Sequence, residues 1–299
     1  DARRAYIYKT EDYGNRWDHI SEDEDILGPI HVLIQDVDVS ELLFAGAEDG
    51  LYVTLNEGGV WMKWPETFPS ISVRSIAMHP TRHDLLVGTE GRDVFVLDDL
   101  NPLRDLVSNP QIANLDFYLF EPDTAYVHVN PPFSGGLFRE HDRSVGTAKP
   151  YGASFYYWFD GADSISPVNI EVLDFENKTV RTLKDYPQRG INHFVWDLRE
   201  DLPGQLKEIK DSDRSSLFRG IEVLPGSYKI QIKQGLNQVE QRIEVVGDPR
   251  FEVALVDRIT KYQALKRYLG VEEKLFAIEN WADSVNQRIA EVLEQLGAM

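Results

Sequence analysis

The first hundred residues alternate apolar and polar positions in short runs, which is the pattern of half-buried β-strands. A sequence repeat organises these runs. The segment "TEDYGNRW" places Thr10, Asp12, Gly14 and Trp17 at fixed intervals, and the same intervals return forty-four positions later in "TLNEGGVW". The residues of the second copy are Thr54, Asn56, Gly58 and Trp61.

A period of about 40–45 residues built from short strands is typical of β-propeller blades, each a four-stranded sheet that cannot bury its faces alone. The segment "LLFAGAEDGLYVTL" also aligns with "LLVGTEGRDVFVLDD", which follows at a similar spacing. We interpret residues 5–10 and 17–21 as the last two strands of one blade, 30–65 as a whole blade and 72–106 as the next. The first domain, 1–106, is therefore predicted to be the last two and a half blades of a propeller.

Two and a half blades would leave an open edge, because propellers close with about four to eight blades or more. The remaining blades lie either on another chain or earlier in a longer protein. We favour the second alternative, in which this chain is the C-terminal region of a large precursor. In either case the remaining blades are the first predicted partner.

The pattern changes twice after the propeller. Residues 107–150 hold many turn-forming residues, with "VNPPFSGG" as the clearest cluster, and we expect a connector that docks on the propeller. Residues 151–248 return to short alternating strands with Asn-Lys, Gly and Pro-Gly turns, which predicts a β-sandwich. From 249 to 299 apolar residues recur every three or four positions, which predicts a helical tail, either one long helix bent at Gly270 or a helical hairpin.

The repeated pattern resembles the Asp-box, or bacterial neuraminidase repeat, of sialidases, of the sortilin ectodomain and of tandem-propeller xyloglucan hydrolases. The segment "VGTEGRDVFVLDDLNPLRDL" (87–106) is similar to the last blade of a group of large exported bacterial proteins, labelled sortilin-like or glycosyl-hydrolase-like. In that group an immunoglobulin-like domain and a helical tail follow the propellers. The phrases "EVLDFENKTVRTL", "FVWDLRE" and "LPGSYKIQI" resemble the immunoglobulin-like domain of flagellar hook-capping proteins.

This resemblance implies a mainly β chain, in which partial Asp-box propeller blades precede an immunoglobulin-like β-sandwich and a C-terminal long helix or helical hairpin. Trp196 and Tyr228 would lie in the core of the sandwich. The chain would be exported, to the periplasm, the cell surface or the medium. Sialidase activity is not carried over with the repeat, because the tyrosine–arginine centre of those enzymes has no identifiable counterpart here.

The amino-acid composition excludes some classes of binding partner. The 299 residues include 50 Asp and Glu against 31 Lys and Arg, a formal charge of −19, and such a surface repels nucleic acid and anionic membranes. Cysteine is absent, so no disulfide and no thiolate metal site can form. No apolar run approaches the roughly 18 residues that span a bilayer, so we expect no membrane span.

All residue types of the repeat have a structural explanation. The carboxylate of Asp12 would accept hydrogen bonds from backbone N–H groups in a turn, Gly14 would permit a positive φ, and Trp17 would pack between blades. Asn56 can make the same turn but cannot act as a general acid or base. We therefore assign structural roles to Thr10, Asp12, Gly14, Trp17, Thr54, Asn56, Gly58 and Trp61, and no catalytic role to any of them.

Two other acidic pairs are weak candidates for chemistry. Asp98 and Asp99 close the last blade, but glycoside hydrolysis needs two carboxyl groups about 5–5.5 or 6.5–9.5 Å apart across a groove, and adjacent strand residues point to opposite faces. Asp36 and Asp38 could contribute oxygen ligands to a calcium ion, the only cofactor we consider. The sequence has no zinc-protease, serine-hydrolase or nucleotide-binding motif.

We expect a non-catalytic binding or assembly component with a protein or glycan ligand, because propeller faces and sandwich edges offer broad recognition surfaces. One alternative is part of a glycoside hydrolase of the tandem-propeller type, whose cleft would lie mostly in N-terminal blades. Another is a sortilin-like peptide-binding receptor. The apolar seam of the helical tail must also be covered, either by the propeller rim or by a coiled-coil contact with another subunit, which would make the protein a homo-oligomer.

Overall fold

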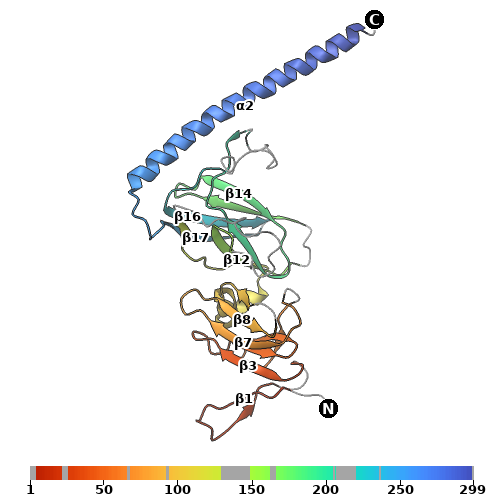
Figure 1. Ribbon diagram of the computed structural model, residues 1–299, viewed down its shortest axis with the longest axis vertical. Helices are drawn as coiled ribbons and strands as arrows, with labels where there is room; N and C mark the ends of the chain where they lie inside the picture. Colours follow the sequence, from red (N-terminus) through yellow and green to blue (C-terminus); the bar gives the residue numbers. More distant parts are fainter. Residues whose placement is uncertain are drawn as a thin grey trace. The chain divides into compact units, whose positions relative to one another are not determined.

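The computed structural model describes residues 5–21, 26–65, 68–91, 94–128, 149–161, 166–204, 206, 220–235 and 237–297. This part of the chain is mainly β, with several sheets and one long C-terminal helix, as the sequence predicts (Figure 1). The chain divides into two compact units, residues 1–116 and 117–299, and each is described by itself.

Unit 1 holds antiparallel sheets of two, four and three strands in the residues that the structure describes. In sheet order they consist of β1 (Tyr8–Lys9) and β2 (Asp18–His19); β3 (Ile30–Gln35), β4 (Leu43–Ala47), β5 (Gly50–Thr54) and β6 (Met62–Lys63); and β7 (Val73–Met78), β8 (Leu85–Thr89) and β9 (Val94–Leu97). The helix α1 (Asn101–Ser108) and the 3₁₀ helix η1 (Pro110–Asn114) follow the last sheet.

The two larger sheets of unit 1 share a local irregularity. The first strand of each shifts register by a β-bulge, between Ile30 and Val32 in β3 and between Val73 and Ser75 in β7. A bulge leaves one residue unpaired and re-aims its side chain. Opposite Val32 the chain has Gly46, where an added Cβ would lie 2.5 Å from a methyl group of Val73. The close approach of the two sheets therefore needs a glycine at this position.

The core of unit 1 passes from sheet to sheet. One cluster of buried side chains joins the sheet of β3–β6 to the sheet of β7–β9 and includes Phe44, Leu51, Val73 and Leu85. A second cluster joins the same middle sheet to the segment around β1 and β2 and includes Ile7, Tyr52 and Trp61. The middle sheet is thus packed by both of its neighbours in the sequence, whereas Val94 and Val96 of the last sheet are more than half exposed.

The described residues of unit 2 form two sheets that enclose one core. In sheet order they consist of β10 (Phe117–Leu119), β12 (Ala153–Phe159) and β15 (Gly190–Trp196); and of β11 (Ala125–Val127), β17 (Asn237–Gly247), β16 (Gly226–Gln234), β13 (Val168–Leu173) and β14 (Thr179–Asp185). Side chains alternate along β12 between the core and the outer face, as expected for a strand with one buried face. Trp196 is fully buried, and its ring packs edge-on against Tyr228.

Two strands of unit 2 come from the segment that the sequence assigns to a connector, 107–150. Strand β10 pairs antiparallel with β12, and strand β11 pairs parallel with β17, about 120 residues further along the chain. Strand β10 lies within "FYLF" (117–120), where the sequence indicates a strand. Strand β11 is only three residues long, which is too short to be recognised without knowledge of the distant partner strand. Residues 129–148, including "VNPPFSGG", lie outside the described residues.

The chain ends in α2 (Leu255–Gly297), one uninterrupted helix of 43 residues (Figure 1). Of the two predicted forms of the tail it is the long helix. Gly270 lies within it, and the helical hydrogen-bond pattern continues through this residue. In the described residues no helix combines the length and the apolar character that crossing a bilayer requires.

Candidate functional site

The two copies of the repeated pattern, Thr10–Trp17 and Thr54–Trp61, form turns with the same hydrogen bonds. In the first, Thr10 Oγ1 accepts a bond from the backbone N–H of Gly14 at 2.8 Å, and Asp12 Oδ1 accepts one from the N–H of Arg16 at 2.8 Å. In the second, Thr54 Oγ1 bonds the N–H of Gly58 at 3.0 Å, and Asn56 Oδ1 bonds the N–H of Val60 at 2.9 Å. An amide oxygen and a carboxylate oxygen therefore accept the equivalent hydrogen bond in this turn.

The conformation of each turn explains its glycine. Gly14 and Gly58 both have a φ of +91°, in the left-handed region that side chains with a Cβ rarely adopt. The hydrogen bond from the N–H of Arg16 lowers the pKa of Asp12, which keeps its carboxylate ionised in the exposed turn. The side chain of Asp12 is thus engaged by the turn itself.

The tryptophans of the two turns lie in different places. Trp61 is 4% exposed, and its indole N–H donates to the carbonyl of Ile20, in the preceding repeat, at 2.7 Å. Trp17 is 57% exposed, and its indole N–H donates to the carbonyl of Gly14 within its own turn at 3.1 Å. Within the part of the chain that the structure describes, Trp61 connects two repeats, whereas Trp17 bonds within its own turn.

Asp36 and Asp38, the candidate calcium ligands, both form ion pairs with an arginine. The side chain of Asp36 is fully buried, and its carboxylate accepts hydrogen bonds from Arg104 Nε and Nη2 at 3.0 and 2.9 Å. It also accepts bonds from the backbone N–H groups of Asp38 and Val39. Asp38 lies 2.9 Å from Arg104 Nη1, and Arg104 comes from α1. Among the described residues no cluster of three metal-ligating side chains occurs.

The arginine in this arrangement escaped sequence reasoning. Arg104 lies 68 positions from Asp36, between Leu103 and Asp105, and is itself buried. A buried guanidinium needs a carboxylate partner, but nothing in the local pattern identifies which of the 50 acidic residues provides it. The ion pair attaches α1 to the end of strand β3 and gives both aspartates a structural role.

The other acidic pair also contributes bonds to the fold. Asp99 Oδ1 accepts a hydrogen bond from the backbone N–H of Asn101 at the start of α1, at 3.0 Å. The N–H of Asp99 donates to Asp84 at 3.2 Å, and Asp99 has a φ of +57°. Asp98 and Asp99 are both partly exposed, and Asp98 precedes this turn.

A cluster of charged and titratable side chains, which the sequence did not reveal, lies at the two β-bulges. His31 Nε2 is 2.7 Å from Glu48, and Arg74 bonds both Glu90 and the ring of His31. His31 and Arg74 are the bulge residues of β3 and β7, while Glu48 and Glu90 follow β4 and β8 directly. The bond from His31 lowers the pKa of Glu48. The same pairing of a bulge side chain with a glutamate is thus repeated in successive sheets.

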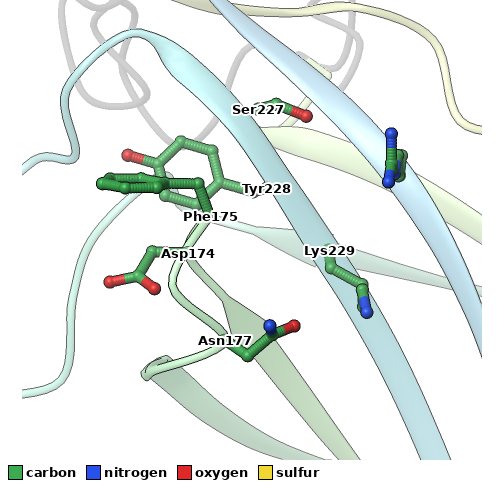
Figure 2. Close-up of a pocket in the computed structure, with 7 residues that line it drawn as sticks. Asp174, Phe175, Asn177, Ser227, Tyr228 and Lys229 are labelled. Carbon is green, nitrogen blue, oxygen red and sulfur yellow. The ribbon is translucent and has the colours of Figure 1, made fainter.

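A hollow of about 320 Å³ opens on unit 2, between the β13–β14 turn and strands β16 and β17. Figure 2 shows the rings of Phe175 and Tyr228 near one another, with Lys229 on the opposite side. Phe175 is 82% exposed, whereas the hydroxyl of Tyr228 donates to the carbonyl of Leu224 at 2.7 Å. Arg242 also lines the hollow and adds a second cationic side chain. The carboxylate of Asp174 lines the hollow as well, so its walls combine aromatic, cationic and anionic side chains.

Apolar side chains are also exposed along α2 from Val271 onward. The exposed large residues there are Val271, Leu275, Ile278, Trp281, Ile289, Val292, Leu293 and Leu296. The first half of the helix packs on its own unit, where Leu269 is buried beside Leu206 and Ile221. A helix with this much exposed apolar surface is a candidate interaction surface.

Comparisons with known proteins give little further information. No protein-family model matches the chain, and no curated protein matches its sequence. Among solved structures the chain is similar to the extracellular domain of the putative one component system BT4673 from B. thetaiotaomicron, with 9% identity and a TM-score of 0.25. The match covers 81% of this chain and 28% of that chain, so this chain spans less than a third of its length. A likeness at this level assigns neither fold nor function.

Proposed function

We propose that this chain is a non-catalytic binding and assembly component, the C-terminal part of a large exported β-propeller protein. The observation that carries the proposal is the 43-residue helix α2, which packs on its own unit near its start and exposes apolar side chains from Val271 to Leu296. Leaving so many large apolar side chains in water is unfavourable, by about 25 cal/mol for each Å² that a partner would bury. The helix is therefore the element through which we expect the protein to join other chains.

The sheets of unit 1 are, in this proposal, blades of an Asp-box propeller. Trp61 and Gly58 both pack against Ile20 of the preceding repeat. The tryptophan and glycine of one blade would contact the preceding blade in this way. In a propeller a preceding blade would cover Trp17 in the same way. The similarity of residues 87–106 to large exported bacterial proteins supports export.

Unit 2 is, in this proposal, an immunoglobulin-like domain. Its two sheets enclose one core that contains a fully buried tryptophan, Trp196. The bond from the hydroxyl of Tyr228 to the carbonyl of Leu224, near the start of a strand, has the form of the tyrosine corner of such domains. The hollow beside Phe175 supports a binding role for this domain, with a glycan or a peptide as its ligand.

The experiment is native mass spectrometry of the protein purified from the cells that make it, with identification of every chain in each complex. We expect complexes heavier than a single copy of the native protein, and we expect Ile289→Asp to release it from them. Gln287→Asp, an equal change on another face of the same helical turn, is the control. Monomers for wild type and Ile289→Asp alike would overturn the assembly role.

A further inference from the structure

One face of α2 carries apolar residues at strictly alternating intervals of four and three. We call this row the α2 seam. Its members are Val271, Leu275, Ile278, Ala282, Val285, Ile289, Val292 and Leu296. A hydrophobic repeat of 3.5 residues is the signature of helices that wind around one another in a left-handed coiled coil. Val271, Ile278 and Leu296 are all more than half exposed, so the seam is uncovered in this chain.

The unit's own packing uses a different face of the helix. The side chains that pack there are Tyr262, Leu265, Leu269 and Phe276, beside Leu206 and Ile221. If the seam residues are given heptad positions a and d, these side chains fall at positions b and e. The same helix can therefore stay attached to its sandwich while the seam contacts another molecule.

Charges beside the seam indicate which partner fits. Position g holds Arg267 and Lys274, and position e holds Glu272 and Glu279. In a parallel, in-register coiled coil each g residue faces the e residue five positions later on the neighbouring helix. Arg267 would then face Glu272 of a second copy, and Lys274 would face Glu279. An antiparallel pair would oppose e with e and g with g, which places like charges together. The charges are thus complementary to those of another copy in parallel orientation.

The residue types in the seam indicate how many helices associate. Leucine at d with β-branched residues at a favours two strands, whereas leucine at a with isoleucine at d favours larger assemblies. All four d residues are β-branched. They are Val271, Ile278, Val285 and Val292. Two of the four a residues, Leu275 and Leu296, are leucine. Trp281 at g and Leu293 at e are both exposed and widen the apolar strip on either side. A wide strip suits a bundle in which each helix contacts two neighbours.

We infer that α2 binds other copies of this chain in a parallel coiled coil of three or four helices. The inference rests on the assembly role proposed above and specifies its partner, orientation and size. It would present three or four copies of unit 2, each with its own hollow, from one stalk. Multivalent display of this kind raises the apparent affinity for a repetitive ligand without any new contact.

The first test is analytical ultracentrifugation of the purified full chain alone. We expect a species of three or four times 34.2 kDa, and a fall to 34.2 kDa for Ile278→Asp and for Ile289→Asp. Gln287→Asp should keep the mass of the wild type. Circular dichroism would verify that unit 2 stays folded in each variant. A wild-type chain that remains at 34.2 kDa at every concentration overturns the inference.

The second test separates parallel from antiparallel packing without touching the apolar residues. Lys274→Glu should weaken a parallel assembly, because it places two glutamates opposite each other, and Lys274→Glu with Glu279→Lys should restore it. We expect the single change to raise the dissociation constant several-fold and the double change to return it to the wild-type value. Strengthening by Lys274→Glu alone would indicate antiparallel packing and overturn the inference.

The two proposals can fail separately. If the chain alone is monomeric but native complexes contain a different protein bound through the seam, self-association is wrong and the assembly role stands. If neither self-association nor seam-dependent complexes are found, both are wrong.

Discussion

Trp17 and Trp61 end two turns with the same internal hydrogen bonds, but Trp17 is 57% exposed and Trp61 is 4% exposed. The turn itself is made by local residues, since its donors and acceptors lie within a few positions of one another. The burial of the tryptophan depends on a neighbouring sheet, which for Trp61 carries Ile20. The turn therefore forms from local residues alone, whereas the burial of its tryptophan requires a contact between repeats.

The largest expected effect is the replacement of the two tryptophans. Trp61→Ala should lower the free energy of unfolding of unit 1 by about 3–5 kcal/mol, because it leaves a cavity between two sheets. Trp17→Ala should change it by about 0.5 kcal/mol or less, as for other exposed positions. Urea unfolding followed by circular dichroism measures both. Equal losses would show that the two tryptophans have the same environment in solution and would remove the contrast.

A smaller effect is expected from the threonines that close the turns. Thr54 is fully buried, so Thr54→Val leaves the N–H of Gly58 without its acceptor and should cost about 1–3 kcal/mol. Thr10 closes an exposed turn, where water can replace its hydroxyl, so Thr10→Val should cost less than about 1 kcal/mol. The same unfolding measurement compares them. A larger loss at Thr10 would contradict the assignment of the exposed turn.

The smallest expected effect is a pH dependence that the turn of Asp12 should show and the turn of Asn56 should not. The folded turn lowers the pKa of Asp12 below its ordinary value, so the ionised carboxylate stabilises the turn at neutral pH and this contribution is lost as the pH falls through the lowered pKa. Asn56 does not titrate, so its turn should be unaffected. Amide exchange measured by NMR should show that the N–H of Arg16 loses protection in acid while that of Val60 does not.

The matched variant for this titration is Asp12→Asn. It should abolish the pH dependence at Arg16 and retain the turn, because the amide oxygen of Asn56 already makes the equivalent bond. Acid-dependent exchange at Arg16 in this variant would assign the titration to another carboxylate.

Local signals in the sequence predict some parts of this chain and not others. The mainly β character and the long C-terminal helix follow from periodicity, and the residue types of the two turns suffice to predict their hydrogen bonds because all partners are near in sequence. The unbroken path of α2 through Gly270 is less predictable, since one glycine costs a helix only about 1 kcal/mol and neighbouring contacts decide the outcome.

Contacts between distant residues account for what the sequence does not reveal. Arg104 and Asp36 meet across 68 positions, and His31 meets Arg74 across 43. The bulges that bring the second pair together depend on the register of each sheet, which has no signature of its own in single residues. The hollow beside Phe175 likewise combines a hairpin turn with strands that begin about fifty residues later.

The parallel pairing of β11 with β17 has a mechanical consequence. Ala125 lies opposite Val245 and Val127 opposite Gly247, so the two strands run side by side in the same direction. Tension that pulls backward on the start of β11 and forward on the end of β17 acts along the strands and loads their hydrogen bonds in shear, all together rather than one after another. A chain held at its N-terminal end and pulled through α2 would therefore resist extension at this short ladder of hydrogen bonds.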